Sequence, residues 1–132
     1  MNIILCLDDK NGILFNKRRQ SRDRVLCERV LELSAGSRLL MNEYSAKIFP
    51  EGNIIVDENF LENAQVGDYC FIENADFLRS TEKIEDVIIY RWNRVYPSDV
   101  KIDASFFSGR EAVSTEDFEG SSHDKITEVI YR

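Results

Sequence analysis

The chain has 132 residues, of which 43% are hydrophobic, and this suits one compact domain because about 100 to 150 residues is the usual size for a single core. Its 24 acidic and 17 basic residues give a formal charge of −7, so general nucleic-acid binding and attraction to anionic membranes are not expected. The first apolar run, residues 3–7, is too short for a membrane span or a signal peptide. We therefore expect a cytoplasmic protein.

The three cysteines, Cys6, Cys27 and Cys70, fall inside apolar segments and form no CxxC pair. Zinc ligands normally come as closely spaced Cys and His pairs, and His123 is the only histidine in the sequence. None of the adjacent acid pairs has the spacing of a calcium-binding loop. The sequence therefore predicts reduced thiols and no metal site.

Residues 2–7, NIILCL, form a nearly continuous apolar run, which is typical of a central strand covered on both faces. Residues 8–12 provide turn chemistry, because Asn11 and Gly12 tolerate a positive φ angle. Residues 13–15 are expected to return to the core before the charged stretch that starts at Lys17.

A helix is predicted to follow this stretch. Ser21 is a suitable N-cap, and Asp23 would place a carboxylate in the first turn, where the helix dipole favours negative charge. Leu26, Val30 and Leu33 recur at helical spacing and form one apolar stripe. The glycine at position 36 is a natural end to the helix.

The remaining elements are predicted to be short, as in compact α/β units. Strands are expected at 38–42, 53–57, 69–73 and 86–92, with an edge strand at 100–102 and a last strand at 125–131 that has an antiparallel partner. Helical turns are expected at 43–49 and 76–83, and a short helix or loop at 58–66. Residues 103–124 are expected to be irregular chain pinned by phenylalanines.

One segment, residues 17–24, concentrates positive charge in this acidic protein, and we call it the cationic loop. Arginines beside an aromatic side chain suit phosphate contact and base stacking. The alternative is a solvated loop whose arginines pair with nearby acids. The candidate ligand-binding residues are Lys17, Arg18, Arg19, Arg22 and Arg24 of the loop, together with Arg91, Trp92 and Arg94.

His123 could be a general base, because histidine titrates near neutrality. Spacing alone assigns no Ser or Cys nucleophile to it. The expected role is therefore that of a lone polar residue near a turn.

Several short segments, taken in order, resemble one known family. Asn11-Gly12-Ile13 is similar to the first loop of the dihydrofolate reductases, and Leu40-Met41 is similar to the end of their second strand. Phe71-Ile72 stands where the family has the strand before its three-glycine turn, and residues 122–132 are similar to its closing strand. The resemblance covers nearly the whole chain thinly. It implies a shortened mixed sheet flanked by helices.

In that family an acid at the start of the first long helix assists protonation of the pterin, and Asp23 matches it in place. The resemblance therefore makes Asp23 the candidate catalytic residue. The alternative interpretation is a first-turn aspartate that only stabilises the helix.

The cofactor positions depart from the family. Asn42-Glu43 replaces its Gly-Arg pair, and Glu73-Asn74-Ala75 replaces its three-glycine turn. Carboxylates stand where phosphates would bind, and side chains block the close approach that glycine permits. We therefore expect no NADPH binding and no cofactor.

The segments FNKRRQSRDR, YRWNR and SSHDKIT also resemble a family of short bacterial proteins sometimes labelled ribonuclease Z. That zinc chemistry needs an HxHxDH cluster and further ligands for two metals. With His123 alone, the sequence does not support the label.

The sequence thus predicts a single α/β domain over residues 1–132, with a shortened, dihydrofolate reductase-like mixed sheet. We expect a protein without reductase activity that binds a ligand or partner, with an anionic small molecule or a nucleotide as the candidate. The alternatives are a diverged NADPH-dependent reductase that uses Asp23 and a module that binds RNA or nucleotides through the cationic loop.

Overall fold

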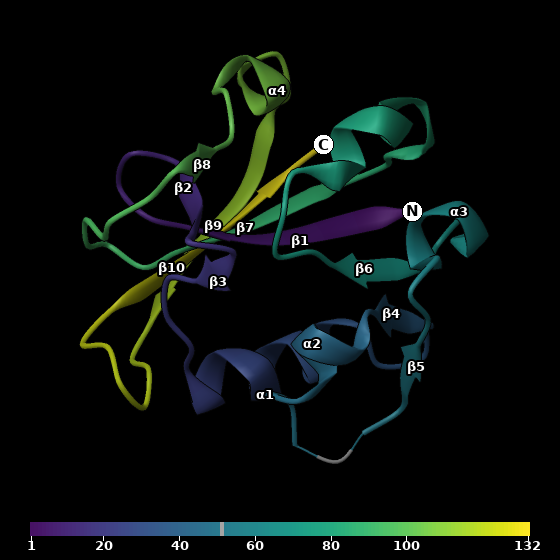
Figure 1. Ribbon diagram of the computed structural model, residues 1–132, viewed down its shortest axis with the longest axis horizontal. Coiled ribbons are helices and arrows are strands. Elements are labelled where there is room, and N and C mark those ends of the chain that lie inside the picture. Colours follow the sequence, from purple (N-terminus) through teal and green to yellow (C-terminus); the bar gives the residue numbers. More distant parts are fainter. Residues whose placement is uncertain (51) are drawn as a thin grey trace.

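The computed structural model describes residues 1–50 and 52–132 (Figure 1). Its main sheet has seven strands in the order β5-β4-β6-β1-β7-β10-β9. The first five strands in this order are parallel, and β10 runs antiparallel to both β7 and β9. The strands are β1 (Asn2–Leu7), β4 (Leu39–Met41), β5 (Ile54–Val56), β6 (Tyr69–Phe71), β7 (Val87–Arg91), β9 (Ala112–Phe118) and β10 (Ile126–Tyr131). This mixed sheet with short helices confirms the predicted single-domain α/β class.

Strand β1 is central in the sheet and both of its faces are covered, as its apolar run predicts. Ile3 and Leu5 point into one core, which also contains Phe77 and Phe107. Ile4 points into the other core, which contains residues of helix α1 (Arg24–Leu33) and of β7. In Figure 1, α1 and α2 (Glu43–Ala46) lie on one side of the sheet, and α4 (Ser105–Ser108) lies on the other.

Helix α1 forms where the apolar stripe predicts it, but its cap differs from the prediction. Asp23, rather than Ser21, is the N-cap, and its side chain accepts hydrogen bonds from the backbone amides of Val25 and Leu26. Asp23 has extended backbone angles and therefore precedes the first turn. The prediction of Ser21 as the cap was wrong because both residue types are good caps and the sequence alone could not rank them. Gly36, with φ 84°, follows the end of the helix.

A second sheet of three antiparallel strands has the order β3-β2-β8. These strands are β2 (Gly12–Phe15), β3 (Arg18–Arg19) and β8 (Val100–Lys101). Ile13 is buried, as expected, whereas Phe15 is 43% exposed, so the predicted return of Phe15 to the core was wrong. The small sheet holds the cationic loop beside the carboxyl end of β1.

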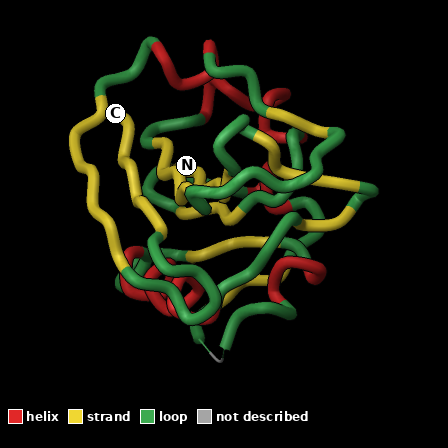
Figure 2. Tube along the Cα trace, turned by 90° about the vertical axis from the view of Figure 1, so that its left-hand side faces the viewer, coloured by secondary structure: helices red, strands yellow, loops and turns green. Residues whose placement is uncertain are grey.

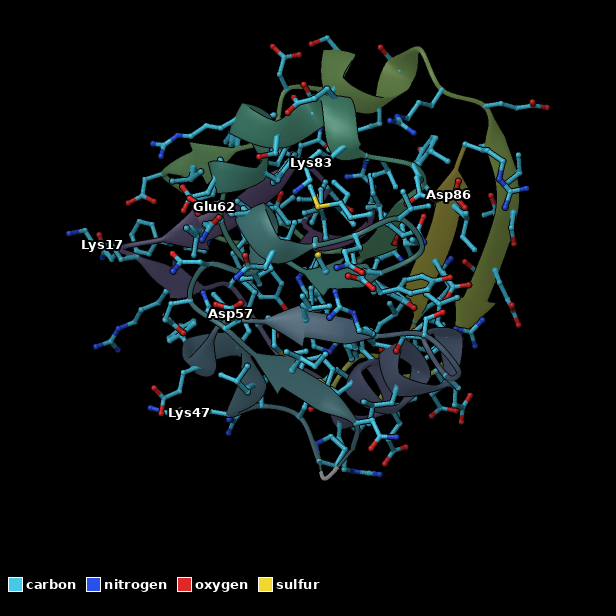
Figure 3. The ribbon with its side chains drawn as sticks, turned by 90° about the vertical axis from the view of Figure 1, so that its right-hand side faces the viewer. Lys17, Lys47, Asp57, Glu62, Lys83 and Asp86 are labelled. Carbon is cyan, nitrogen blue, oxygen red and sulfur yellow. The ribbon has the colours of Figure 1, made fainter. Side chains whose placement is uncertain are left out.

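The remaining turns agree with the predicted positions: the turn at 76–83 has its predicted length, whereas those within 43–49 and 58–66 are shorter than predicted. Helix α3 (Phe60–Asn63) and the 3-10 helix η1 (Asp76–Lys83) pack over the first core. Lys83 Nζ donates to the backbone carbonyls of Leu61 and Glu62, which joins η1 to α3 (Figure 3).

The segment 103–124 is more regular than predicted. It contains α4 and the seven-residue strand β9, which lies at one edge of the main sheet. Six of the seven β9 residues are exposed, so the strand has no apolar alternation that could have predicted it. The opposite edge of the sheet is β5, where Ile55 and Val56 are exposed.

No helix within residues 1–50 and 52–132 has the length and apolar character needed to cross a membrane.

Candidate functional site

The carboxyl ends of β1 and β7 meet the start of α1 and the turn between β9 and β10. Because β10 is antiparallel to β7, its first residues lie beside the last residue of β7, with Thr127 opposite Arg91. Figure 2 shows the β9–β10 hairpin from the side, with its turn next to α1. Residues that are about 100 positions apart in the sequence are thereby brought into contact.

Asp23 lies at the centre of this junction, and its side chain is fully buried. Besides capping α1, the carboxylate accepts hydrogen bonds from the amides of Ser121 and Ser122 at 3.0 and 2.8 Å. A Cβ atom on Gly120 would fall on the Asp23 carboxylate, so the turn can approach this closely only with glycine at that position. The hairpin turn therefore covers the carboxylate completely.

His123 extends the network outward from Asp23. Its Nδ1 lies 2.9 Å from Asp23 Oδ2, while Nε2 lies 3.0 Å from Ser21 Oγ and 3.1 Å from Tyr96 Oη. The imidazole stacks on Trp92, with ring centres 4.5 Å apart and planes inclined by 26°. The structure thus overturns the expectation that His123 is a lone polar residue, because the fold gives it both an acid and a hydroxyl partner.

The network should make the protein less stable in acid. Burial alone would raise the pKa of Asp23, but the hydrogen bonds from His123 and from nearby backbone amides outweigh burial and hold this pKa well below its ordinary value of 3.8. As the pH falls, the unfolded chain therefore takes up the Asp23 proton before the folded chain does. The contribution of Asp23 to stability is complete above about pH 4 and is lost progressively below it.

Urea unfolding of the wild type and Asp23→Asn between about pH 7 and pH 2 measures this contribution. The difference in the free energy of unfolding between the two proteins should narrow as the pH falls. A difference that stays constant over the whole range would contradict the assignment.

A second buried carboxylate, Asp8, follows β1 and anchors the loops around the site. Its Oδ1 accepts from the amide of Gly12 at 2.8 Å, and its Oδ2 accepts from Gln20 Nε2 and the amide of Tyr96, each at 3.1 Å. Burial favours a higher pKa for Asp8, but these hydrogen bonds outweigh it and lower the pKa. Asp8 therefore fixes the cationic loop and Tyr96 relative to β1.

The arginines of the cationic loop have different environments. Arg19 forms a two-point ion pair with Glu73, with contacts of 2.7 and 2.9 Å, and its guanidinium lies over the Tyr44 ring. Arg24 pairs with Glu28 one turn further along α1. Arg18 and Arg22 are exposed and have no ion-pair partner in the described part of the chain. Lys17 projects outward from the body of the protein (Figure 3).

The three candidates at the end of β7 and just after it also differ from one another. Arg91 donates to the carbonyl of Asp8 and to the side chain of Asn11, so it supports the turn after β1. Trp92 is only 3% exposed and stacks on His123, which leaves no open ring face for a nucleobase. Arg94 is exposed and lines a separate depression beside His123.

Two adjoining depressions share Arg18 and Arg19, and together we call them the cationic cleft. Their volumes are about 450 and 640 Å³. Aromatic rings of Phe15 and Tyr96 line the first depression, and Tyr44 and Ser21 line the second. The structure therefore combines Arg18 and Arg22 with exposed aromatic surface, and it separates them from Arg91 and Trp92.

The two segments that replace the phosphate-binding positions of the dihydrofolate reductases, 42–43 and 73–75, contain polar groups that bond to other parts of the chain. Glu73 accepts from Ser45 Oγ at 2.8 Å in addition to its ion pair with Arg19. Asn42 caps α2, and the amide of Glu43 donates to the carboxylate of Glu58. The acidic residues at these positions thus join β6, α2 and the cationic loop.

No group of three or more His, Cys, Asp or Glu side chains in residues 1–50 and 52–132 is arranged to hold a metal ion. Cys6, Cys27 and Cys70 are free thiols. Burial raises the pKa of both Cys27 and Cys70 to about 12, so these two thiols remain protonated at neutral pH.

Sequence reasoning missed Ser21 and Tyr96 as partners of His123. The available signal was positional: His123 lies just before the last predicted strand, and Asp23 lies at the start of the first long helix. Antiparallel pairing of the last strand with the strand 86–92 would have placed His123 and Asp23 at the same end of the strands.

The sequence matches no protein-family model and no curated protein.

Proposed function

We propose that the protein binds an anionic small molecule in the cationic cleft, on a dihydrofolate reductase-like fold that has no reductase activity, and that it works in the cytoplasm. The observation that carries this proposal is the pair of exposed arginines, Arg18 and Arg22, beside aromatic rings in a chain with a charge of −7. Depressions of this size suit a small ligand.

Charge and shape both support an anion with a planar group. Arginine binds carboxylate or phosphate at two points, and its neighbours Phe15 and Tyr44 are 43% and 41% exposed. Exposed aromatic rings can stack on a planar ligand. A mononucleotide has both features and is therefore a suitable probe.

The contacts of Asp23 argue against the reductase alternative. A carboxylate that protonates a pterin must reach the substrate, whereas the Asp23 side chain is fully buried beneath the β9–β10 turn. Glu73 replaces a glycine of the turn where the dihydrofolate reductases bind cofactor phosphate, and its carboxylate beside Ser45 is unfavourable for a phosphate at this position. The burial of Trp92 likewise removes this ring as a platform on which an RNA base could stack.

Thermal-shift titration with adenosine 5′-monophosphate tests the proposal, with adenosine, pyrophosphate and NADPH as comparison ligands. A ligand present at about 100 times its dissociation constant adds about 2.7 kcal/mol to stability. The monophosphate should stabilise the protein in a saturable manner, adenosine should do so less, and NADPH should give no saturable stabilisation. Arg18→Ala/Arg22→Ala should weaken binding and its salt dependence.

The control is Arg79→Ala/Lys101→Ala, which removes the same charge from exposed positions outside the cleft. It should bind the monophosphate as the wild type does. If neither the monophosphate nor pyrophosphate stabilises the protein beyond the effect of sodium chloride at equal ionic strength, the cleft is not an anion site.

A further inference from the structure

Ser21, His123 and Asp23 form a continuous relay from the buried junction to the cationic cleft. The Oγ atom of Ser21 is 3.0 Å from His123 Nε2, and His123 Nδ1 is 2.9 Å from Asp23 Oδ2. These distances lie within the range for a nucleophile, its general base and the carboxylate that orients the base. The three residues come from two segments that are about 100 positions apart.

The partners of the imidazole fix which nitrogen can act as a base. Asp23 is an anion that accepts hydrogen bonds, so Nδ1 carries the proton and the lone pair is on Nε2. The Trp92 ring and the buried carboxylate hold the plane of the imidazole. Nε2 is thereby directed at the hydroxyls of Ser21 and Tyr96.

Both hydroxyls belong to the cationic cleft. Ser21 is half-buried and lines the depression that contains Arg22, and Tyr96 lines the adjoining depression that contains Phe15. A substrate in the cleft can therefore reach Ser21 Oγ, while Asp23 and the body of His123 remain shielded from water. This combination of a reachable hydroxyl and a protected base is what nucleophilic catalysis requires.

We propose that Ser21 is the nucleophile of a hydrolase that acts on small anionic carboxylic esters, with His123 as the general base and Asp23 as its positioning residue. The preference for an anionic ester rests on the binding function proposed above for Arg18 and Arg22. The nucleophilic role of Ser21 rests on the relay alone.

The reaction balances without a cofactor. Ser21 Oγ bonds to the ester carbonyl carbon as His123 Nε2 takes its proton, and the carbon–oxygen bond to the alcohol then breaks as Nε2 returns that proton to the leaving oxygen. Water next attacks the acyl-serine, giving its proton to Nε2, and the bond to Ser21 Oγ breaks as Oγ regains a proton. The products are a carboxylic acid and an alcohol, and no atom is oxidised or reduced.

Tyr96 has a defined role in these reaction steps. Nε2 has one lone pair, and in the relay the Ser21 hydroxyl donates to it, so the Tyr96 hydroxyl beside it keeps its own proton for another acceptor. This proton is available when negative charge develops on the carbonyl oxygen. The Tyr96 hydroxyl can donate to this oxyanion, as preorganised donors do in acyl transfer.

Labelling with an uncharged alkyl fluorophosphonate, followed by peptide mass spectrometry, tests the nucleophile without involving the charge of the cleft. The wild type should be labelled at Ser21. Ser21→Ala should not be labelled, and Ser114→Ala, which removes an exposed serine on β9, should be labelled like the wild type. His123→Gln should react at least about 100-fold more slowly, because its amide cannot act as a base.

The labelling rate of His123→Gln is compared with that of the wild type only if the variant melts cooperatively, which shows that it is folded. Tyr96→Phe is a second variant, and it keeps the His123 base. Tyr96→Phe should still be labelled but should hydrolyse 4-nitrophenyl acetate more slowly than the wild type. Absence of the label from Ser21 in folded wild-type protein, or equal reactivity of wild type and folded His123→Gln, overturns the proposal.

Comparison of 4-nitrophenyl hemisuccinate with 4-nitrophenyl acetate tests the substrate class. The anionic ester should have the higher kcat/KM, and Arg18→Ala/Arg22→Ala should remove the preference. Labelling of Ser21 without any preference for the anionic ester would support the nucleophile and overturn its assigned substrate and the anion-binding function. Binding of the anionic monophosphate without labelling of Ser21 would support the anion-binding function and overturn the role of Ser21 as a nucleophile.

Discussion

Replacement of Asp23 by alanine is expected to lower the free energy of unfolding by about 4 kcal/mol, which is at the upper end for a single substitution. Loss of the helix cap accounts for about 1 to 2 kcal/mol. The remainder comes from the donors that lose their acceptor, because an unsatisfied buried polar group costs about 1 to 3 kcal/mol. These donors include the amides of Ser121 and Ser122 and the His123 ring.

Urea unfolding followed by circular dichroism measures this loss, provided that the slope of free energy against urea is unchanged. Asp124→Ala is the matched control, since it removes an exposed acid from the same turn and should change stability by less than about 0.5 kcal/mol. A similar, small effect of both substitutions would mean that the Asp23 network contributes little to the fold.

Replacement of Arg29 by alanine is expected to cost about 3 kcal/mol. Glu128 on β10 is only 5% exposed, and its Oε2 accepts from Arg29 Nε at 2.9 Å and from Tyr90 Oη at 2.8 Å. Without Arg29 this carboxylate would be a buried charge with no cation beside it, which is among the costliest changes that a side chain can suffer. Arg29 also pairs with Glu116 and packs its guanidinium over Phe118 on β9, so its loss loosens the hairpin as well.

The same helix provides the control for this experiment. Arg24 also pairs with a glutamate, but the Arg24 and Glu28 side chains are 68% and 47% exposed. Exposed pairs of this kind contribute about 0.3 to 0.5 kcal/mol. Chemical denaturation should therefore separate Arg29→Ala from Arg24→Ala by more than about 2 kcal/mol. Equal midpoints would show that solvent, rather than Arg29, compensates the Glu128 charge.

The sequence predicts the parts of the fold that have strong local periodicity. The apolar run of β1, the stripe of α1 and the β-branched residues of β7 each determine one element and the face it buries. Strand β9 could not be predicted in this way. Its exposed polar residues are held in a strand by pairing with β10, and this tertiary contact leaves no hydrophobic pattern.

The candidate site was only partly predictable for the same reason. The concentration of arginines near the start of α1 is visible in the sequence, but the partners that neutralise Arg19 and support Arg91 are visible only in the fold. His123 shows the limit most clearly. Its chemistry depends on Asp23 and Ser21, which antiparallel strand pairing brings beside it, and spacing along the chain does not show that proximity unless the pairing of the last strand is known.

The two edges of the main sheet differ in their tendency to recruit further strands. Strand β9 is long enough to pair with another chain, but the charges of its exposed Glu116 and Asp117 oppose edge-to-edge aggregation. Strand β5 has exposed Ile55 and Val56, yet it is only three residues long and offers few backbone groups. Charge thus protects the β9 edge against pairing with another chain, and the short length of β5 protects the other edge. Changes that neutralise β9 or lengthen β5 would favour aggregation even where the folded domain itself is unaffected.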